Sequence, residues 1–149
     1  MLIEEWMTRQ VTSVKPLDSL RHARQIMEEH RINQLPVVVN GKLVGILTDR
    51  DVRDATPSVF DFNAYGEPQK GRAVSDPAKI TVESVMSANV LTLGPKDTIF
   101  AAADLIRGRR IGAVPIVEGE HVVGILTRSD LLRALLALGQ RVEAPRNQP

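Results

Sequence analysis

The chain has 149 residues, of which 43% are apolar and 25% charged, a composition typical of a globular protein with one domain or two small repeats. Its formal net charge of +1 gives no global attraction to nucleic acid, and the absence of cysteine excludes disulfides, thiolate nucleophiles and Cys-ligated metals. The sequence contains neither a signal-peptide pattern nor the ~18 apolar residues of a membrane span. We therefore expect a cytoplasmic protein with no membrane partner.

The chain repeats itself without a gap, because Met7 returns 79 residues later as Met86. Other pairs at the same spacing are Pro16 and Pro95, Asp18 and Asp97, Ile32 and Ile111, Pro36 and Pro115, Gly45 and Gly124, Thr48 and Thr127, and Asp51 and Asp130. Such self-similarity indicates two copies of one structural unit. We predict repeat one over residues 1–54, a linker over 55–84, repeat two over 85–140 and a disordered tail over 141–149.

Each copy begins with a short predicted strand, Val11–Val14 or Val90–Leu93, which a proline ends because it cannot continue a ladder. A helix follows, with its apolar residues spaced by three and four. Gly108 is expected to stop the helix of the second copy.

Two further strands form a hairpin in each copy, Leu35–Val39 with Leu43–Leu47 and Val114–Val117 with Val122–Leu126. Asn40-Gly41 predicts a type I′ turn, and Gly119-Glu120, with glycine first, predicts a type II′ turn. The near-continuous Val, Ile and Leu of these strands indicate burial on both faces. A closing helix begins after Thr48 or Thr127.

The linker is polar and rich in turn residues, yet it holds most of the few aromatic side chains, and we expect part of it to pack. The closing helix of the second copy is leucine-rich through Leu138. The fold expected is therefore α/β or α+β, with two β-α-β-β-α repeats.

The pattern Gly-x-x-Thr-x-x-Asp occurs at the last strand-to-helix junction of each copy, as Gly45, Thr48 and Asp51 and again as Gly124, Thr127 and Asp130. One interpretation is a capping box, in which threonine and aspartate satisfy the free N–H groups of the helix. A second is nucleotide binding, since the junction suits a phosphate and the carboxylate can accept both hydroxyls of a ribose. A glycine inside a strand also indicates a close approach to its backbone. Capping and ligand binding are compatible.

The order of these motifs, from Met-Thr or Met-Ser to Gly-Ile-Leu-Thr-x-x-Asp, resembles the CBS domain, and the two copies resemble the pair called a Bateman module. The resemblance covers residues 6–53 and 85–138. It implies two repeats packed with pseudo-twofold symmetry around two clefts, which bind an adenine nucleotide or a related adenosyl compound. It also implies a homodimer formed through the repeat helices.

In this family the motif threonine contacts phosphate and the aspartate holds the ribose, and these roles carry over to the four motif residues named above. Each cleft is expected to combine the motif of one repeat with the first strand of the other, which would group Thr48 and Asp51 with Thr92, and Thr127 and Asp130 with Ser13. Residues before the second strand are expected to line the base or phosphate, although simple strand entry also explains them; they are Ile32, Asn33, Gln34, Ile111, Gly112 and Ala113.

The copies differ after the motif threonine, where Asp49 in the first corresponds to Arg128 in the second. An arginine can pair with a polyphosphate that a carboxylate repels. The hypothesis is that the second cleft prefers the more phosphorylated ligand.

The resulting prediction is a non-catalytic regulatory module that binds AMP, ADP, ATP, S-adenosylmethionine or NAD(H) and signals in trans to a protein that the sequence does not identify. No catalytic triad, P-loop, metal-ligand spacing or nucleic-acid recognition pattern is present. The alternative is a structural or protein-interaction pair whose clefts stay empty.

Overall fold

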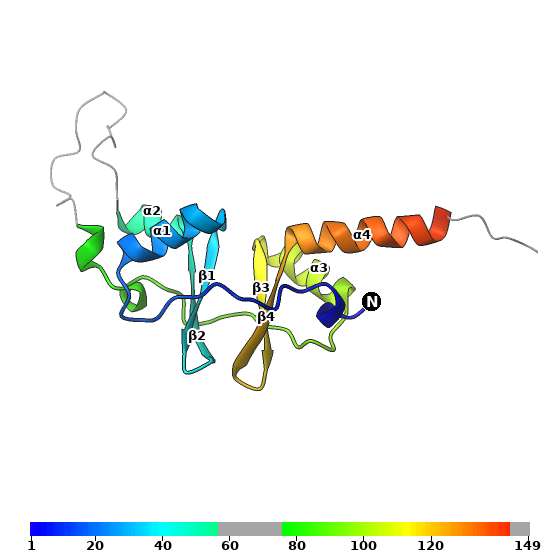
Figure 1. Cartoon of the computed structure of the whole chain (residues 1–149), viewed down its shortest axis with the longest axis horizontal. Helices are drawn as coiled ribbons and strands as arrows, with labels where there is room; N and C mark the ends of the chain where they lie inside the picture. Colours follow the sequence, from blue (N-terminus) through cyan, green and yellow to red (C-terminus); the bar gives the residue numbers. More distant parts are fainter. Residues whose placement is uncertain (57–75, 144–149) are drawn as a thin grey trace, which may run out of the picture. The chain divides into compact units, whose positions relative to one another are not determined.

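The structure is a computed structural model that describes residues 1–56 and 76–143. The chain forms two compact units. One, here called the contiguous unit, is Thr12–Val90; the other, the split unit, joins Met1–Val11 to the chain from Leu91 onwards. Each unit combines helices with an antiparallel hairpin, which confirms the expected α+β fold (Figure 1). The repeat bounds and the pseudo-twofold packing stay predictions.

The contiguous unit contains, in order, α1 (Leu20–His30), β1 (Gln34–Val39), β2 (Lys42–Thr48), α2 (Asp49–Ala55) and two short 3₁₀ turns at Pro77–Lys79 and Val82–Ser84. Helix α1 forms because the Ser19 hydroxyl accepts a hydrogen bond from the His22 N–H at 3.1 Å, which caps its start. Its buried residues follow the expected spacing of three and four: Leu20, Ala23 and Met27. The helix ends where Arg31 adopts a left-handed conformation.

The split unit contains a 3₁₀ turn (Ile3–Glu5), α3 (Ile99–Arg109), β3 (Ala113–Glu118), β4 (His121–Thr127) and α4 (Arg128–Glu143). The prediction that Gly108 stops α3 is wrong, because the glycine lies inside the helix and Arg110, with φ of 55°, ends it. Helix α4 continues through residues 141–143, where the predicted tail begins. The remaining tail and most of the linker, including its aromatic residues, lie outside the described residues.

The hairpin turns match the sequence prediction. Asn40 and Gly41 both have positive φ, as a type I′ turn requires, whereas in the second hairpin Gly119 has positive φ and Glu120 does not, as in type II′. Figure 1 shows the helices of each unit at the end of its hairpin that lies away from the turn. That end is where the Thr-x-x-Asp motif lies, since β2 ends at Thr48 and β4 ends at Thr127.

The predicted first strands are reduced to single bridges. Val14 pairs in parallel with Val37 of β1, and Leu93 pairs in parallel with Ile116 of β3. The proline two residues after each of these positions is consistent with so short a pairing. The predicted burial on both faces holds for β1 and β3, where consecutive residues are buried. In β2 and β4, buried and partly exposed residues alternate towards the C-terminal end of each strand.

Each unit takes its N-terminal segment from the neighbouring sequence repeat. Ile3 lies in the core of the split unit with Val114 and Leu126, whereas its counterpart Val82 lies in the core of the contiguous unit. The backbone repeats this exchange, because Ile3 N–H donates to Asp97 O at 2.9 Å and Val82 N–H donates to Asp18 O at 2.8 Å. The described part of the predicted linker, residues 76–84, thus supplies core to the contiguous unit.

Candidate functional site

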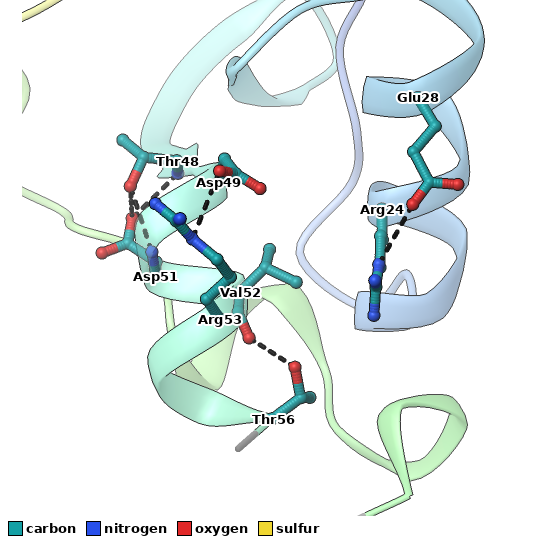
Figure 2. Close-up of polar contacts among 8 residues, drawn as sticks. All are labelled: Arg24, Glu28, Thr48, Asp49, Asp51, Val52, Arg53 and Thr56. Carbon is teal, nitrogen blue, oxygen red and sulfur yellow. Dashed lines mark hydrogen bonds and ion pairs between the residues drawn. The ribbon is translucent and has the colours of Figure 1, made fainter. Parts of the chain in front are cut away.

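The first Thr-x-x-Asp motif forms a closed set of hydrogen bonds at the start of α2. The Thr48 N–H and the Thr48 hydroxyl each donate to Asp51 Oδ2 at 2.8 Å, and the Asp51 N–H donates to Thr48 Oγ1 at 3.2 Å (Figure 2). This is the predicted capping box, completed by an additional bond between the two side chains. It holds the Asp51 carboxylate, which is partly exposed, in one orientation.

The second motif repeats this geometry at the start of α4. The Thr127 N–H and hydroxyl donate to Asp130 Oδ2 at 2.8 Å each, and the Asp130 N–H donates to Thr127 Oγ1 at 3.3 Å. Asp130 is buried, with 5% of its surface exposed. Its Oδ1 accepts a 2.5 Å charge-assisted bond from Nη2 of Arg133, one helical turn further on.

Residues at the entry to β1 lie beside the first motif. Gln34 pairs with Thr48 across the hairpin, so that their side chains share one face of the sheet. The Asp49 N–H donates to Asn33 O at 2.9 Å, and Ile32 packs against the core of the unit. Gln34 Oε1 is buried and has no hydrogen-bond partner among the described residues. The structure therefore brings the predicted strand-entry residues and the motif together.

The same contacts occur around the second motif. Ala113 pairs with Thr127, and the Arg128 N–H donates to Gly112 O at 3.2 Å. In addition, Arg128 Nε donates to Ile111 O at 3.1 Å, which fixes the base of its guanidinium beside the strand entry. The predicted role of Arg128 towards a phosphate stays a prediction. Its counterpart Asp49 pairs instead with Arg53 at 3.3 Å on the surface (Figure 2).

The first-strand residues lie in the unit of their own repeat. Ser13 precedes the bridge at Val14 in the contiguous unit, and Thr92 precedes the bridge at Leu93 in the split unit. The predicted groupings of Thr92 with the first motif and of Ser13 with the second join residues of different units, and they stay predictions.

The two motif glycines have a packing role inside their units. A Cβ atom on Gly124 would lie 2.5 Å from Met7 Sδ and 3.2 Å from Thr8 O, and one on Gly45 would overlap Met86 and lie 3.0 Å from Ser87 O. The close approach expected at these glycines is therefore made by protein atoms. A ligand contact at either glycine stays a prediction.

Two repeats with the same strand–helix motif indicate a family, and the family model of the CBS domain matches residues 3–58 and 82–137. The chain belongs to the CBS-domain family. It is 31% identical over 129 residues to the CBS domain-containing protein YhcV of Bacillus subtilis, covering 87% of this chain and 81% of that protein. Some other curated relatives are longer; the chain spans 23% of an inosine-5'-monophosphate dehydrogenase of Korarchaeum cryptofilum at 32% identity.

Solved structures of CBS proteins include complexes with adenosyl compounds. The CBS pair of protein MJ0100, in complex with 5'-methylthioadenosine and S-adenosyl-L-methionine, superposes with a TM-score of 0.71 at 27% identity, covering 93% of this chain and 98% of that one. CBSX2 in complex with AMP superposes with a TM-score of 0.75 at 25% identity, covering 93% and 98%.

In this CBS pair, sequence reasoning missed Arg133. The residue occupies the position of Asp54 in the first repeat, so that an alignment of the two copies shows the change of charge next to the motif. Within residues 1–56 and 76–143, no group of three His, Asp or Glu side chains could hold a metal ion. No helix in those ranges is long and apolar enough to cross a bilayer.

Proposed function

We propose that this CBS pair is a non-catalytic regulatory module that binds an adenosyl ligand at a Thr-x-x-Asp motif and signals in trans to a partner protein. The observation that carries the proposal is the fixed orientation of the Asp51 carboxylate. Its Oδ2 accepts both hydrogen bonds from Thr48, which leaves Oδ1 able to accept bonds from a ligand. A carboxylate so placed can accept hydrogen bonds from the two hydroxyls of a ribose. The complexes of related CBS proteins with AMP and S-adenosylmethionine support this choice.

The ligand class follows from what the motif recognises. AMP, ADP, ATP, S-adenosylmethionine and NAD(H) all carry an adenosine ribose, and a carboxylate that binds the ribose does not distinguish among them. The group attached at the 5' position must therefore be selected elsewhere. From the sequence, Arg128 is the side chain expected to bind a phosphate at the second motif.

Regulation requires that the ligand bind one conformation of the protein more tightly than another. A ligand shifts a conformational equilibrium only by this difference in affinity, and a partner protein then recognises the favoured conformation. The threonine and aspartate of the motif can bind and orient an adenosyl ligand, as a sensor requires.

A thermal-shift panel tests the proposal. A ligand at 100 times its dissociation constant stabilises the folded state by ~2.7 kcal/mol, which corresponds to a rise in Tm of about 5–10 °C for a chain of this size. We expect such a rise with at least one of AMP, ADP, ATP, S-adenosylmethionine and NADH, and none with inorganic phosphate, which lacks the ribose.

The double variant Asp51→Asn with Asp130→Asn is the matched control, because each amide keeps the size of the carboxyl group but loses its charge. It should lose the rise in Tm. If no adenosyl compound raises Tm for the wild-type chain, the capping bonds alone explain the motif, and the alternative of a structural CBS pair with empty ligand sites is favoured.

We also propose that the split unit forms a homodimer through α3 and α4. These helices border an apolar groove of about 600 Å³, and several large apolar side chains along them are exposed: Phe100, Leu132, Leu135 and Leu136. Exposed apolar patches of this kind mark interaction surfaces. A second copy would cover the leucines with the same leucines, as in an isologous interface.

Replacing Leu135 by glutamate should therefore convert a dimer to a monomer. Leu135 lines the groove with 62% of its surface exposed, so the variant folds, but a dimer would have to bury a carboxylate among leucines. Sedimentation or light scattering measures the mass. Leu17→Glu is the control, because Leu17 is 76% exposed in the contiguous unit and does not line the groove. A wild-type chain that is already monomeric would contradict the dimer.

A further inference from the structure

The two motifs differ at the second oxygen of the aspartate. In the contiguous unit, Asp51 Oδ1 accepts no hydrogen bond from any residue that the structure describes, whereas Asp51 Oδ2 accepts two. In the split unit, Asp130 Oδ2 accepts the same two bonds and Asp130 Oδ1 is taken by Arg133. The first carboxylate thus keeps a whole oxygen without a protein partner, whereas each oxygen of the second already accepts at least one bond.

Arg133 is held where it is by a second contact. Its Nη2 also donates to the backbone carbonyl of Trp6 at 3.2 Å, so that the N-terminal segment and α4 of the split unit meet at this guanidinium. The Asp130 side chain is only 7% exposed beneath it. A ribose hydroxyl would meet a buried carboxylate that is already engaged in a charge-assisted bond, which is about twice as strong as a neutral one.

The first repeat has no equivalent of this contact. Asp54 stands where the second repeat has Arg133, and a carboxylate cannot donate a hydrogen bond to Asp51. Gln34, beside Thr48, also has a buried oxygen without a partner, whereas the second repeat has Ala113 at that position. A buried acceptor left unpaired is unfavourable until a donor reaches it. The first motif therefore has a carboxylate oxygen and a neighbouring buried amide oxygen without protein partners, and the second motif has neither.

We infer that Arg133 closes the second motif by occupying the place of the ligand hydroxyls, so that the chain binds one adenosyl ligand, at Thr48 and Asp51. This inference rests on the proposed function and adds to it the site and the stoichiometry. It replaces the expectation, drawn from Arg128, that the second motif binds the more phosphorylated ligand. Arg128 and Arg133 act in opposite directions there, and the carboxylate that the ribose needs is the group that Arg133 covers.

Calorimetric titration with AMP and, separately, with S-adenosylmethionine tests the inference through the number of ligands bound per chain. The wild-type chain should bind one. Arg133→Leu removes the guanidinium but keeps a helix-forming apolar stem, and it should raise the number to two. Arg141→Leu is the matched control, since Arg141 is an exposed arginine on the same helix that makes no contact with the motif; it should still bind one.

The aspartates give a test that does not depend on the folding of the Arg133 variant. In the wild-type background, Asp51→Asn should weaken binding by about tenfold to a hundredfold, because it removes charge-assisted bonds to the ligand. Asp130→Asn should leave the affinity within about twofold, since that carboxylate does not reach the ligand.

Two bound ligands in the wild-type chain, or a loss of affinity in Asp130→Asn equal to that in Asp51→Asn, would overturn the inference and leave the proposed function standing. An Arg133→Leu chain that is folded and still binds one ligand would do the same. Failure of both AMP and S-adenosylmethionine to bind any of these chains would overturn the proposed function and the inference together.

Discussion

Replacing Ile3 by alanine is expected to lower the free energy of unfolding by about 2–5 kcal/mol, the range for truncating a fully buried isoleucine. Ile3 has no exposed surface and packs with Val114 and Leu126 in the core of the split unit. Removing its side chain leaves a cavity that the backbone cannot close, because the Ile3 N–H is bonded to Asp97 O. Equilibrium unfolding in urea measures the loss.

Hydrogen exchange can also show which unit Ile3→Ala destabilises. Amide hydrogen exchange in Ile3→Ala should accelerate in β3 and β4 and stay unchanged in β1 and β2, because the side chain belongs to the core of the other repeat. Leu17→Ala, at a residue with 76% exposure, is the control and should cost little. Faster exchange in β1 and β2 would show that the segment packs on its own repeat, contrary to the structure.

Gly124→Ala should destabilise the protein by about 1–3 kcal/mol, the usual cost of overpacking a tight site. The added methyl group would meet Met7 Sδ at 2.5 Å and Thr8 O at 3.2 Å; the thioether can rotate, but the carbonyl is fixed because it accepts from the Ile125 N–H at 2.9 Å. Thermal or urea unfolding provides the measurement.

Gly108→Ala is the matched control for this prediction. Gly108 lies inside α3, and nothing lies within 4 Å of the place where its Cβ would be. Alanine should therefore stabilise the helix there, by roughly 0.5–1 kcal/mol. A Gly124→Ala chain as stable as Gly108→Ala would contradict the packing role of the motif glycine.

The local features were predictable because their causes lie within a few residues. Thr48 and Asp51 form their box whatever surrounds them, and Asn40-Gly41 adopts its turn because both residues tolerate positive φ. The end of α3 was not predicted, since glycine is the commonest residue to end a helix but Arg110 does so here. The apolar pattern of α3 does not indicate that Arg110 adopts a left-handed conformation.

The sequence could not predict which of the two cores each N-terminal segment packs into, because the two repeats are so similar. Ile3 and Val82 occupy equivalent positions, and the two cores have nearly the same apolar pattern, so that hydrophobicity fits either assignment. Only the three-dimensional path of the chain separates them. The Arg133 contact is different, because it is local and the substitution of Asp54 by arginine in the second copy was visible in the sequence.

The exchange of N-terminal segments also determines the order in which the two units can fold during translation. All of the contiguous unit has been synthesised once Val90 is added, and it can fold while the rest of the chain is still being translated. Met1–Val11 is made before β3, β4 and α4 and must wait for them, with Ile3 and Met7 exposed meanwhile. A chain that ends at Val90 should therefore protect β1 and β2 from protease and leave Met1–Val11 open to cleavage.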